Sequence, residues 1–256
     1  MILYGRKVAE SIYQSLKTDN RPFLAVVLIG SDPASILYIK VKEKIAKRLG
    51  IGFHLYRLED NISKEELEGL IARLNQDDKI SGIIIQLPLP KKFDTEKILK
   101  KILPEKDIDG FQRFFPPPTA QAILEILKYY KIDYKGKNIV ILGYGRLVGR
   151  PLEYLLKKQG LSATICDSSI PNLKEKTLRA DILISATGVP GIIKEDMVSK
   201  KAVIIDAGTS ESKGKIVGDV DSRVYVKVLA YTPVPGGVGP VTVACLMRNL
   251  FEAAGE

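Results

Sequence analysis

The chain has 256 residues, of which 45% are hydrophobic and 27% are charged, and a net charge of +9. This composition excludes a mainly disordered chain, and no apolar run approaches the ~18–20 residues of a membrane span. The charge would fit a nucleic acid or a small anion, but the lysines lie in mixed-charge stretches typical of solvated helix faces. Because residues 1–7 lack a signal-peptide layout, we expect a cytoplasmic protein with no membrane partner.

Few residue types are available for chemistry. Two cysteines, Cys166 and Cys245, are too few for a disulfide framework, and one histidine leaves little for a metal site or a Ser-His-Asp triad. His54 lies in an apparent strand among core residues, where we expect a structural role. We therefore expect no bound metal, and chemistry that comes from Lys, Tyr, Asp, Glu, Gln or a cofactor.

Short apolar runs alternate with helical periodicity, which predicts an α/β protein with a mainly parallel sheet. Residues 23–29 are continuously apolar, as in a strand that is covered on both faces. The next helix is expected to begin at Asp32, with Pro33 in its first turn, and to end near Gly50. A strand near 53–58, a helix with a capping box between Ser63 and Glu66, and a strand over 82–86 follow.

Residues 103–118 interrupt this alternation of predicted strands and helices. They end in three prolines, which make a stiff connector, and we place a domain boundary there. The second half is expected to contain a helix over 120–130, strands over 138–142, 163–166, 181–185, 203–206 and 228–231, and a final helix over about 242–253.

The second half opens with a strand that runs into Gly143-Tyr144-Gly145 and then a helix through Gly149. Such glycines let a backbone approach a pyrophosphate, and a helix N-terminus offers free N–H groups. The spacing is one residue longer than in the commonest dinucleotide fingerprint, so a plain tight turn is the alternative. Asp167, just past the next strand, is placed to meet an adenosine ribose, which favours NAD because an acid repels a 2′-phosphate.

In the first half, Tyr38 and Lys42 are four residues apart and share a helix face with Ile45 and Leu49. Desolvation on a partly apolar face lowers the pKa of a lysine, which would suit Lys42 to general-base catalysis. The alternative is a snorkelling side chain with its ammonium in water. Gln86 ends a strand at the edge where open α/β sheets bind ligands, although it could simply hydrogen-bond the strand end.

Two further segments could bind a ligand. Asp107 and Asp109 precede Gly110 in the connector, where such pairs most often form Asx turns. The run from Pro235 to Pro240 combines glycines, which open the backbone to a ligand, with prolines that stiffen it. A linker without a binding role is the alternative for this run.

Four stretches, in this order, resemble the bifunctional methylenetetrahydrofolate dehydrogenase/cyclohydrolase family. They are residues 30–35 with Tyr38 and Lys42, residues 86–90, residues 106–111 and residues 232–242. The resemblance implies two α/β domains that flank a cleft, and a homodimer. It implies a folate-binding catalytic domain over 1–118, rejoined by 242–256, and a Rossmann-like NAD(P)-binding domain over 119–241.

The resemblance also implies NADP-dependent oxidation of 5,10-methylenetetrahydrofolate and hydrolysis of the methenyl product to 10-formyltetrahydrofolate, in one-carbon metabolism. Lys42 would take a proton from water, and Gln86 would hold Lys42 in place. Tyr38 would pack on the folate ring, and Asp109 would hydrogen-bond the pterin. Further folate contacts are implied for Pro235, Gly236 and Gly237, and cofactor contacts for Gly143, Tyr144, Gly145, Arg146, Ser168 and Thr209.

Departures from the family pattern leave alternatives open. The family often has Arg at the position of Tyr144 and usually has Ser at the position of Gly145. NAD is therefore possible as the cofactor, unless Arg146 or Arg150 contacts a 2′-phosphate. The stretch over 111–118 is shorter than usual, which makes a monofunctional dehydrogenase with weak cyclohydrolase activity the second interpretation. A basic nucleic-acid-binding protein that keeps a dinucleotide fold is the remote alternative, and it leaves the candidate catalytic residues without a role.

Overall fold

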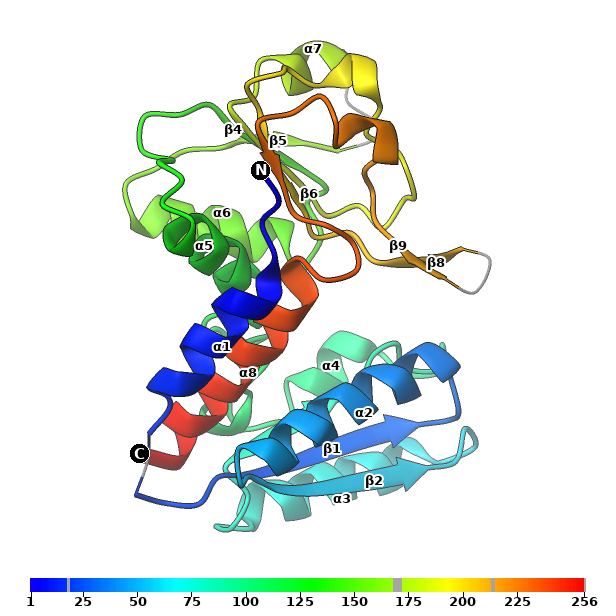
Figure 1. The fold of residues 1–256 in the computed structure, drawn as a ribbon. Coiled ribbons are helices and arrows are strands. Elements are labelled where there is room, and N and C mark those ends of the chain that lie inside the picture. Colours follow the sequence, from blue (N-terminus) through cyan, green and yellow to red (C-terminus); the bar gives the residue numbers. More distant parts are fainter. Residues whose placement is uncertain (18, 168–171, 213–214, 256) are drawn as a thin grey trace. The chain divides into compact units, whose positions relative to one another are not determined.

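A computed structural model describes residues 1–17, 19–167, 172–212 and 215–255 (Figure 1). The chain divides into two compact units, which we name by their main sheets. The five-stranded unit contains Met1–Ile12 and Pro118–Cys245, and the three-stranded unit contains Tyr13–Pro117 and Leu246–Glu256. Both terminal helices, α1 (Gly5–Ser15) and α8 (Val238–Gly255), contribute residues to both units. The domain bounds and the cleft that the family resemblance implies stay predictions.

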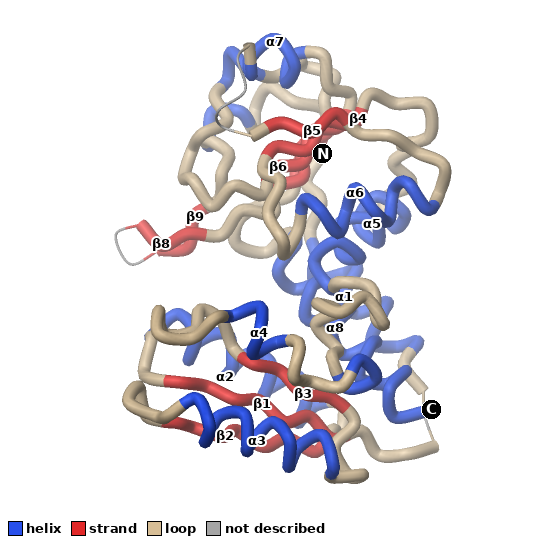
Figure 2. The backbone as a smooth tube through the Cα atoms, turned by 180° about the vertical axis from the view of Figure 1, so that it is seen from behind, coloured by secondary structure: helices blue, strands red, loops and turns tan. Residues whose placement is uncertain are grey.

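In the three-stranded unit every strand pair is parallel, and the strand order is β2-β1-β3. Its elements are β1 (Phe23–Ile29), α2 (Pro33–Arg48), β2 (Gly52–Leu58), α3 (Lys64–Gln76), β3 (Gly82–Ile85), α4 (Thr95–Leu99) and the 3₁₀ turn η1 (Pro104–Lys106). Figures 1 and 2 show α2 and α3 on opposite faces of this sheet. A sheet covered on both faces explains why its central strand is apolar throughout.

The side chains of β1 alternate between the two faces. Ala25, Val27 and Ile29 pack in one cluster with Leu67 and Leu74 of α3. The predicted helix starts are confirmed. The Asp32 side chain accepts the backbone N–H of Ser35 at 2.7 Å, and Ser63 and Glu66 form a complete capping box.

The five-stranded unit has a parallel sheet in the order β10-β7-β6-β4-β5. Its strands are β4 (Ile139–Leu142), β5 (Thr164–Cys166), β6 (Ile182–Ser185), β7 (Val203–Asp206) and β10 (Ala230–Tyr231), and β8 (Ser210–Ser212) pairs with β9 (Lys215–Val217) outside this sheet. The helices are α5 (Pro118–Tyr129), α6 (Gly149–Lys158) and α7 (Leu173–Leu178), with 3₁₀ turns η2 (Glu195–Met197) and η3 (Ser222–Val224).

The strand order of this unit sets where a ligand can bind. The chain passes from β4 to β5 on one side and then crosses to β6 on the other side of β4. Open α/β sheets bind ligands at the carboxyl ends of the strands, where the direction of winding reverses. In this unit that point lies between the ends of β4 and β6.

The predicted α/β class is confirmed, whereas two expectations about local structure are wrong. The last helix begins at Val238 rather than Thr242, because a proline such as Pro240 is tolerated in a first helical turn, where its missing N–H has no partner to lose. His54 is exposed rather than in the core, because β2 is an edge strand of its sheet. None of the helices in the described part of the chain is long and apolar enough to cross a membrane.

Candidate active site

The three-stranded unit brings Lys42 and Gln86 together from different elements. Lys42 lies on α2, and Gln86 directly follows β3. The Lys42 ammonium donates to Oε1 of Gln86 at 3.1 Å, and both side chains are half-buried. The Gln86 amide donates in turn to the Leu87 carbonyl at 2.9 Å, which fixes the orientation of the amide. Lys42 is therefore held in one place rather than extended into water.

Asp109 acts on Lys42 electrostatically. Burial lowers the pKa of Lys42, and the negative charge of Asp109 partly opposes this shift. Burial also raises the pKa of the Asp109 carboxyl, and the positive charge of Lys42 opposes that shift. A desolvated lysine whose amine is neutral below the ordinary lysine range can accept a proton from water.

Tyr38 and Ser35 lie on α2 before Lys42. Tyr38 is one turn away and 39% exposed, so its ring is available to a ligand. Ser35 is buried, and its hydroxyl donates to the Leu87 carbonyl at 3.3 Å. Ser35 thus ties the start of α2 to the segment that carries Gln86. Nothing in the sequence alone indicates this role for Ser35.

Asp107 and Asp109 have different environments. Asp107 is 1% exposed, and its Oδ2 accepts the backbone N–H of Gln112, five residues later, at 2.7 Å. This bond is not the Asx turn expected of such pairs, because an Asx turn is closed by the N–H two residues on. Burial raises the pKa of Asp107 to about 7. The same loop is held from α8 by the buried Asn249, whose amide donates to the carbonyls of Ile108 at 2.8 Å and Pro116 at 3.0 Å. The loop thereby presents Asp109 from a fixed backbone.

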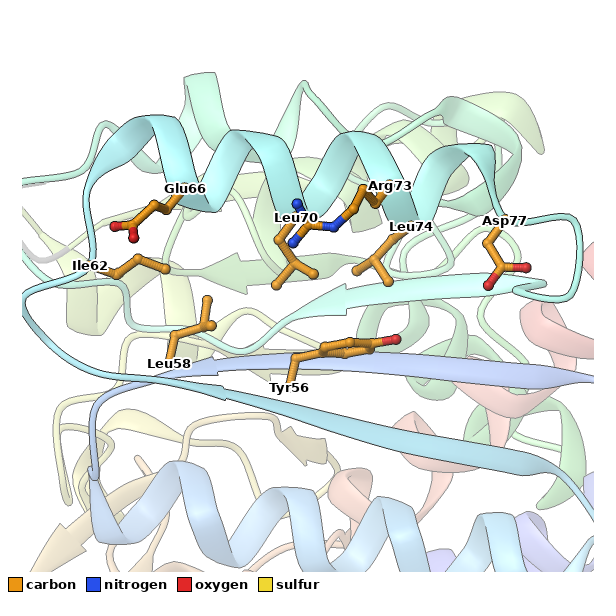
Figure 3. Close-up of a pocket in the computed structure, with 8 residues that line it drawn as sticks. All are labelled: Tyr56, Leu58, Ile62, Glu66, Leu70, Arg73, Leu74 and Asp77. Atoms are coloured by element: carbon orange, nitrogen blue, oxygen red, sulfur yellow. The ribbon is translucent and has the colours of Figure 1, made fainter.

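This unit also contains a cavity that is separate from the site around Lys42. It lies between α3 and β2, with a volume of about 570 Å³ (Figure 3). Its lining residues are Tyr56, Leu58, Ile62, Glu66, Leu70, Arg73, Leu74 and Asp77. None of them is a candidate site residue, and α2, which carries Lys42, covers the opposite face of the sheet.

The five-stranded unit contains the glycine turn, between β4 and α6. Gly143 has φ +96°, and a Cβ there would lie 2.5 Å from the Ala186 carbonyl oxygen. A Cβ on Gly149 would overlap the Gly143 carbonyl oxygen, so the turn packs directly against the start of α6. A Cβ on Gly145 would meet no atom within 4 Å. The turn therefore leaves open backbone at the N-terminal end of a helix, which fits a dinucleotide pyrophosphate.

Tyr144 connects this turn to α6. Its hydroxyl donates to Oε2 of Glu153 at 2.6 Å, and Glu153 forms an ion pair with Lys157 at 2.7 Å. Arg150 lies over the Tyr144 ring, with the guanidinium carbon 5.5 Å from the ring centroid, and its Nε donates to the Tyr144 carbonyl at 3.2 Å. The tyrosine thus holds an exposed arginine beside the turn.

The other predicted cofactor residues are spread around the carboxyl edge of the same sheet. Arg146 and Thr209 are exposed, and Asp167 is exposed at the end of β5. Ser168 lies outside the described residues. Two buried carboxylates at this edge, Asp206 and Asp219, were not predicted from the sequence, because most of their partners are far away in the chain.

The segment before α8 has a structural role. The Gly236 carbonyl accepts the backbone N–H of Gly5 at 2.9 Å, which ties the segment to the start of α1. Gly236 has φ +105°, and a Cβ on Gly237 would lie 2.6 Å from the Pro233 carbonyl oxygen. Pro235 is exposed, whereas Gly237 is buried. Folate contacts at these three residues stay predictions.

Both parts of the chain match models of one protein family. The catalytic domain of tetrahydrofolate dehydrogenase/cyclohydrolase matches residues 3–109, and the NAD(P)-binding domain matches residues 117–256. The bifunctional protein FolD of Aquifex aeolicus is 42% identical, over 99% of this chain and 94% of its own length.

Solved structures agree with this match over nearly the whole chain. The bifunctional FolD methylenetetrahydrofolate dehydrogenase/cyclohydrolase from Campylobacter jejuni has a TM-score of 0.94 at 37% identity, and 99% of this chain and 98% of that chain are covered. The Trypanosoma brucei enzyme, complexed with NADP cofactor and inhibitor, has a TM-score of 0.92 at 32% identity, with 98% and 97% covered. The chain therefore belongs to the tetrahydrofolate dehydrogenase/cyclohydrolase family.

Proposed function

We propose that this protein oxidises 5,10-methylenetetrahydrofolate with NADP and hydrolyses the 5,10-methenyl product to 10-formyltetrahydrofolate. The observation that carries the proposal is the hydrogen bond from Lys42 to Gln86, with the charge of Asp109 acting on the same lysine. Full-length similarity to bifunctional relatives supports both activities on one chain.

The five-stranded unit binds and orients the cofactor for the oxidation. The open backbone at Gly145 and the start of α6 hold the pyrophosphate. NADP, when bound, accepts the hydride that the methylene carbon of the folate loses. The resulting methenyl carbon is cationic, so the oxidation needs close positioning of the reactants rather than a protein acid.

Hydrolysis depends on Lys42. Water adds its oxygen to the cationic methenyl carbon, and the neutral amine of Lys42 takes the proton that the water loses. The adduct then loses its remaining hydroxyl proton to form the C=O as the bond from that carbon to N5 breaks, and protonation of N5 leaves the formyl group on N10. The net reaction adds one water and releases one proton. The lowered pKa of Lys42 supplies the neutral amine that this step requires.

The other residues around Lys42 position the base and the folate. Gln86 holds the amine at 3.1 Å, and its own amide is fixed by the Leu87 carbonyl. We assign to Asp109 a hydrogen bond to the pterin and to Tyr38 a stacking contact with the folate ring. The net charge of +9 suits an anionic glutamate tail.

Arg150 favours NADP over NAD. An exposed cation held beside the glycine turn can neutralise a 2′-phosphate, whereas Asp167 at the end of β5 disfavours one. We expect the attraction of Arg150 for the 2′-phosphate to outweigh the repulsion from Asp167. The Tyr144 ring and the Tyr144 carbonyl both hold the Arg150 guanidinium in place. We also propose that the chain works as a homodimer in the cytoplasm, which sedimentation of the purified protein and fractionation of its source cells would test.

The purified protein should be assayed with methylenetetrahydrofolate, with NADP and NAD in parallel. Reduced cofactor and the methenyl absorbance are followed separately. We expect reduced cofactor to form faster with NADP, while the methenyl signal stays low because it is hydrolysed. Methenyl that decays only at the enzyme-free rate would restrict the protein to dehydrogenation. Strongly salt-dependent binding to DNA or RNA, without any reduction, would instead support the nucleic-acid interpretation.

A further inference from the structure

Two buried carboxylates at the carboxyl edge of the five-stranded sheet have no role in the steps above. Asp206 ends β7 and is 1% exposed, and Asp219 lies after β9 and is fully buried. Three backbone N–H groups donate to Asp206, from Gly208 at 3.0 Å, Asp219 at 3.1 Å and Val220 at 3.0 Å. Asp206 therefore fixes both the turn that follows β7 and the segment that carries Asp219.

Asp219 extends this network to the neighbouring strand. Its Oδ2 accepts the Ser185 hydroxyl and the backbone N–H of Thr187, each at 2.7 Å. Ser185 is the last residue of β6. The Asp219 carboxylate thus holds the end of β6, while the backbone N–H of Asp219 is itself held by Asp206 at the end of β7.

This hydrogen-bond network lies next to the glycine turn, at the ends of β6 and β7. A Cβ on Gly143 would lie 3.1 Å from the Thr187 nitrogen, so the glycine turn packs on the segment that Asp219 holds. The pyrophosphate belongs at the glycine turn and the adenosine ribose at the end of β5. The remaining half of a dinucleotide, which carries the nicotinamide, then extends over the ends of β6 and β7.

One oxygen of the Asp219 carboxylate has unused acceptor capacity. Its Oδ1 has no hydrogen-bond partner among the described residues, although it is buried. A Cβ on Gly208 would overlap this oxygen. A buried carboxylate with unused acceptor capacity destabilises a fold relative to a fully satisfied or apolar side chain. This oxygen calls for an explanation beyond the two hydrogen bonds that Oδ2 accepts.

We propose that Asp219 is a positioning residue for the nicotinamide half of the cofactor. Its carboxylate acts through the Ser185 hydroxyl and the Thr187 N–H, and it touches no reacting atom. The inference rests on the proposed use of NADP by this unit. If Asp219 holds only the backbone near the ends of β6 and β7, its loss should lower the affinity for ligands that reach those strand ends. The affinity for ligands that bind only at the ends of β4 and β5 should not change.

The test compares two ligands on Asp219→Ala by calorimetric titration. NADP spans the whole edge, whereas adenosine 2′,5′-bisphosphate lacks the nicotinamide half. Without its acceptor, the Thr187 N–H loses its partner and the segment shifts, so we expect the Kd of NADP to rise about tenfold or more. The Kd of adenosine 2′,5′-bisphosphate should stay within about twofold of the wild-type value.

Three further variants keep the test decisive if Asp219→Ala does not fold. Asp219→Asn keeps an acceptor oxygen and should restore most of the NADP affinity. Ser185→Ala removes one donor to the carboxylate and should weaken NADP binding by about threefold, with the bisphosphate again unaffected. Asp221→Asn is the matched control, because that carboxylate lies two residues away and pairs with Arg223 at 2.9 Å instead.

Equal weakening of both ligands, or no change for either in Asp219→Ala and Ser185→Ala, would overturn the positioning role. A wild-type protein that binds adenosine 2′,5′-bisphosphate but not NADP would overturn it as well. A wild-type protein that binds neither ligand would contradict the proposed function itself, and with it this inference.

Discussion

The two units hold their functional groups by opposite means. In the three-stranded unit the groups that we propose for catalysis are side chains, Lys42 with Gln86 and Asp109, which come from a helix, a strand end and a loop. In the five-stranded unit we propose that backbone at the glycine turn, with Arg150, binds the cofactor, and buried carboxylates hold the neighbouring backbone in place. A single substitution can therefore remove the hydrolytic chemistry outright, whereas cofactor binding depends on backbone geometry.

The largest effect is expected from closing the glycine turn. In Gly149→Ala the new Cβ would overlap the Gly143 carbonyl oxygen, which is backbone and cannot rotate away. We expect dehydrogenase kcat/KM with NADP to fall by about 100-fold or more, because a small misplacement of a bound reactant has a cost of this order. Hydrolysis of supplied methenyltetrahydrofolate is the control, since it depends on the other unit. Parallel loss of both activities would show that the variant is simply unfolded.

The pH dependence of hydrolysis tests the environment of Lys42. Because burial lowers its pKa, the neutral amine should be present at lower pH than in an ordinary lysine. The catalysed rate should rise with pH, by up to about tenfold per unit, through a midpoint below the ordinary value of about 10.4. Rates are measured on methenyltetrahydrofolate after subtraction of the enzyme-free reaction.

Asp109→Asn sharpens that measurement. The variant removes the negative charge that raises the pKa of Lys42, so the midpoint of the profile should move to lower pH. The maximal rate should also fall, because the contact with the pterin is lost. The test therefore compares the pH of the midpoint and not the maximal rate. A midpoint that moved to higher pH would contradict the assigned coupling of the two side chains.

A smaller effect is expected at Arg150, where a side chain rather than backbone contributes to cofactor binding. Arg150→Ala removes the cation that stacks on Tyr144. We expect KM for NADP to rise about tenfold, because charge-assisted contacts to phosphate contribute about 1.5–3 kcal/mol. The KM for NAD, which has no 2′-phosphate, is the internal control. If the ratio of the two kcat/KM values did not change, Arg150 would not contact the 2′-phosphate.

The smallest effect concerns stability. Burial raises the pKa of Asp107 to about 7, above the unfolded value of about 4, so the native state keeps its proton to higher pH. This stabilisation is fully present below about pH 4 and is lost as pH rises through about 7. Asp107→Asn cannot ionise, so its free energy of unfolding should fall less steeply between pH 5 and 8, by up to about 1 kcal/mol per pH unit.

Denaturant titrations at several pH values measure this slope. Asp221→Asn is the control, because its ion pair with Arg223 keeps the pKa of Asp221 far below this window. A slope in Asp107→Asn as steep as that of the wild-type protein would show that Asp107 is already ionised at pH 5.

The difference between the units also determines what the sequence reveals. Local periodicity puts Lys42 and Tyr38 on one helix face and Gln86 at the end of a strand. It left a snorkelling lysine and a strand-end hydrogen bond as alternatives, and only the family resemblance gave these residues roles. The glycine turn is readable locally as well, since strand, turn and helix are consecutive in the chain. Local signals of this kind predict the α/β class and most of the central elements.

Long-range contacts are not readable in this way. Asp219 bonds to Ser185 and Thr187, more than thirty residues earlier, and nothing in its local sequence indicates those partners. The start of α8 at Val238 was missed because glycine and proline indicate a loop, whereas contact with the start of α1 fixes that segment. The exposure of His54 depends on the edge position of β2, which only the strand order shows.

The central claim is that hydrolysis depends on the Lys42 amine, and cofactor binding does not. Lys42→Met keeps the length of the side chain and removes the base. The most direct measurement follows methenyltetrahydrofolate hydrolysis and NADP affinity on one preparation of this variant. We predict hydrolysis at the enzyme-free rate with a wild-type Kd for NADP. Hydrolysis at the wild-type rate would contradict the account.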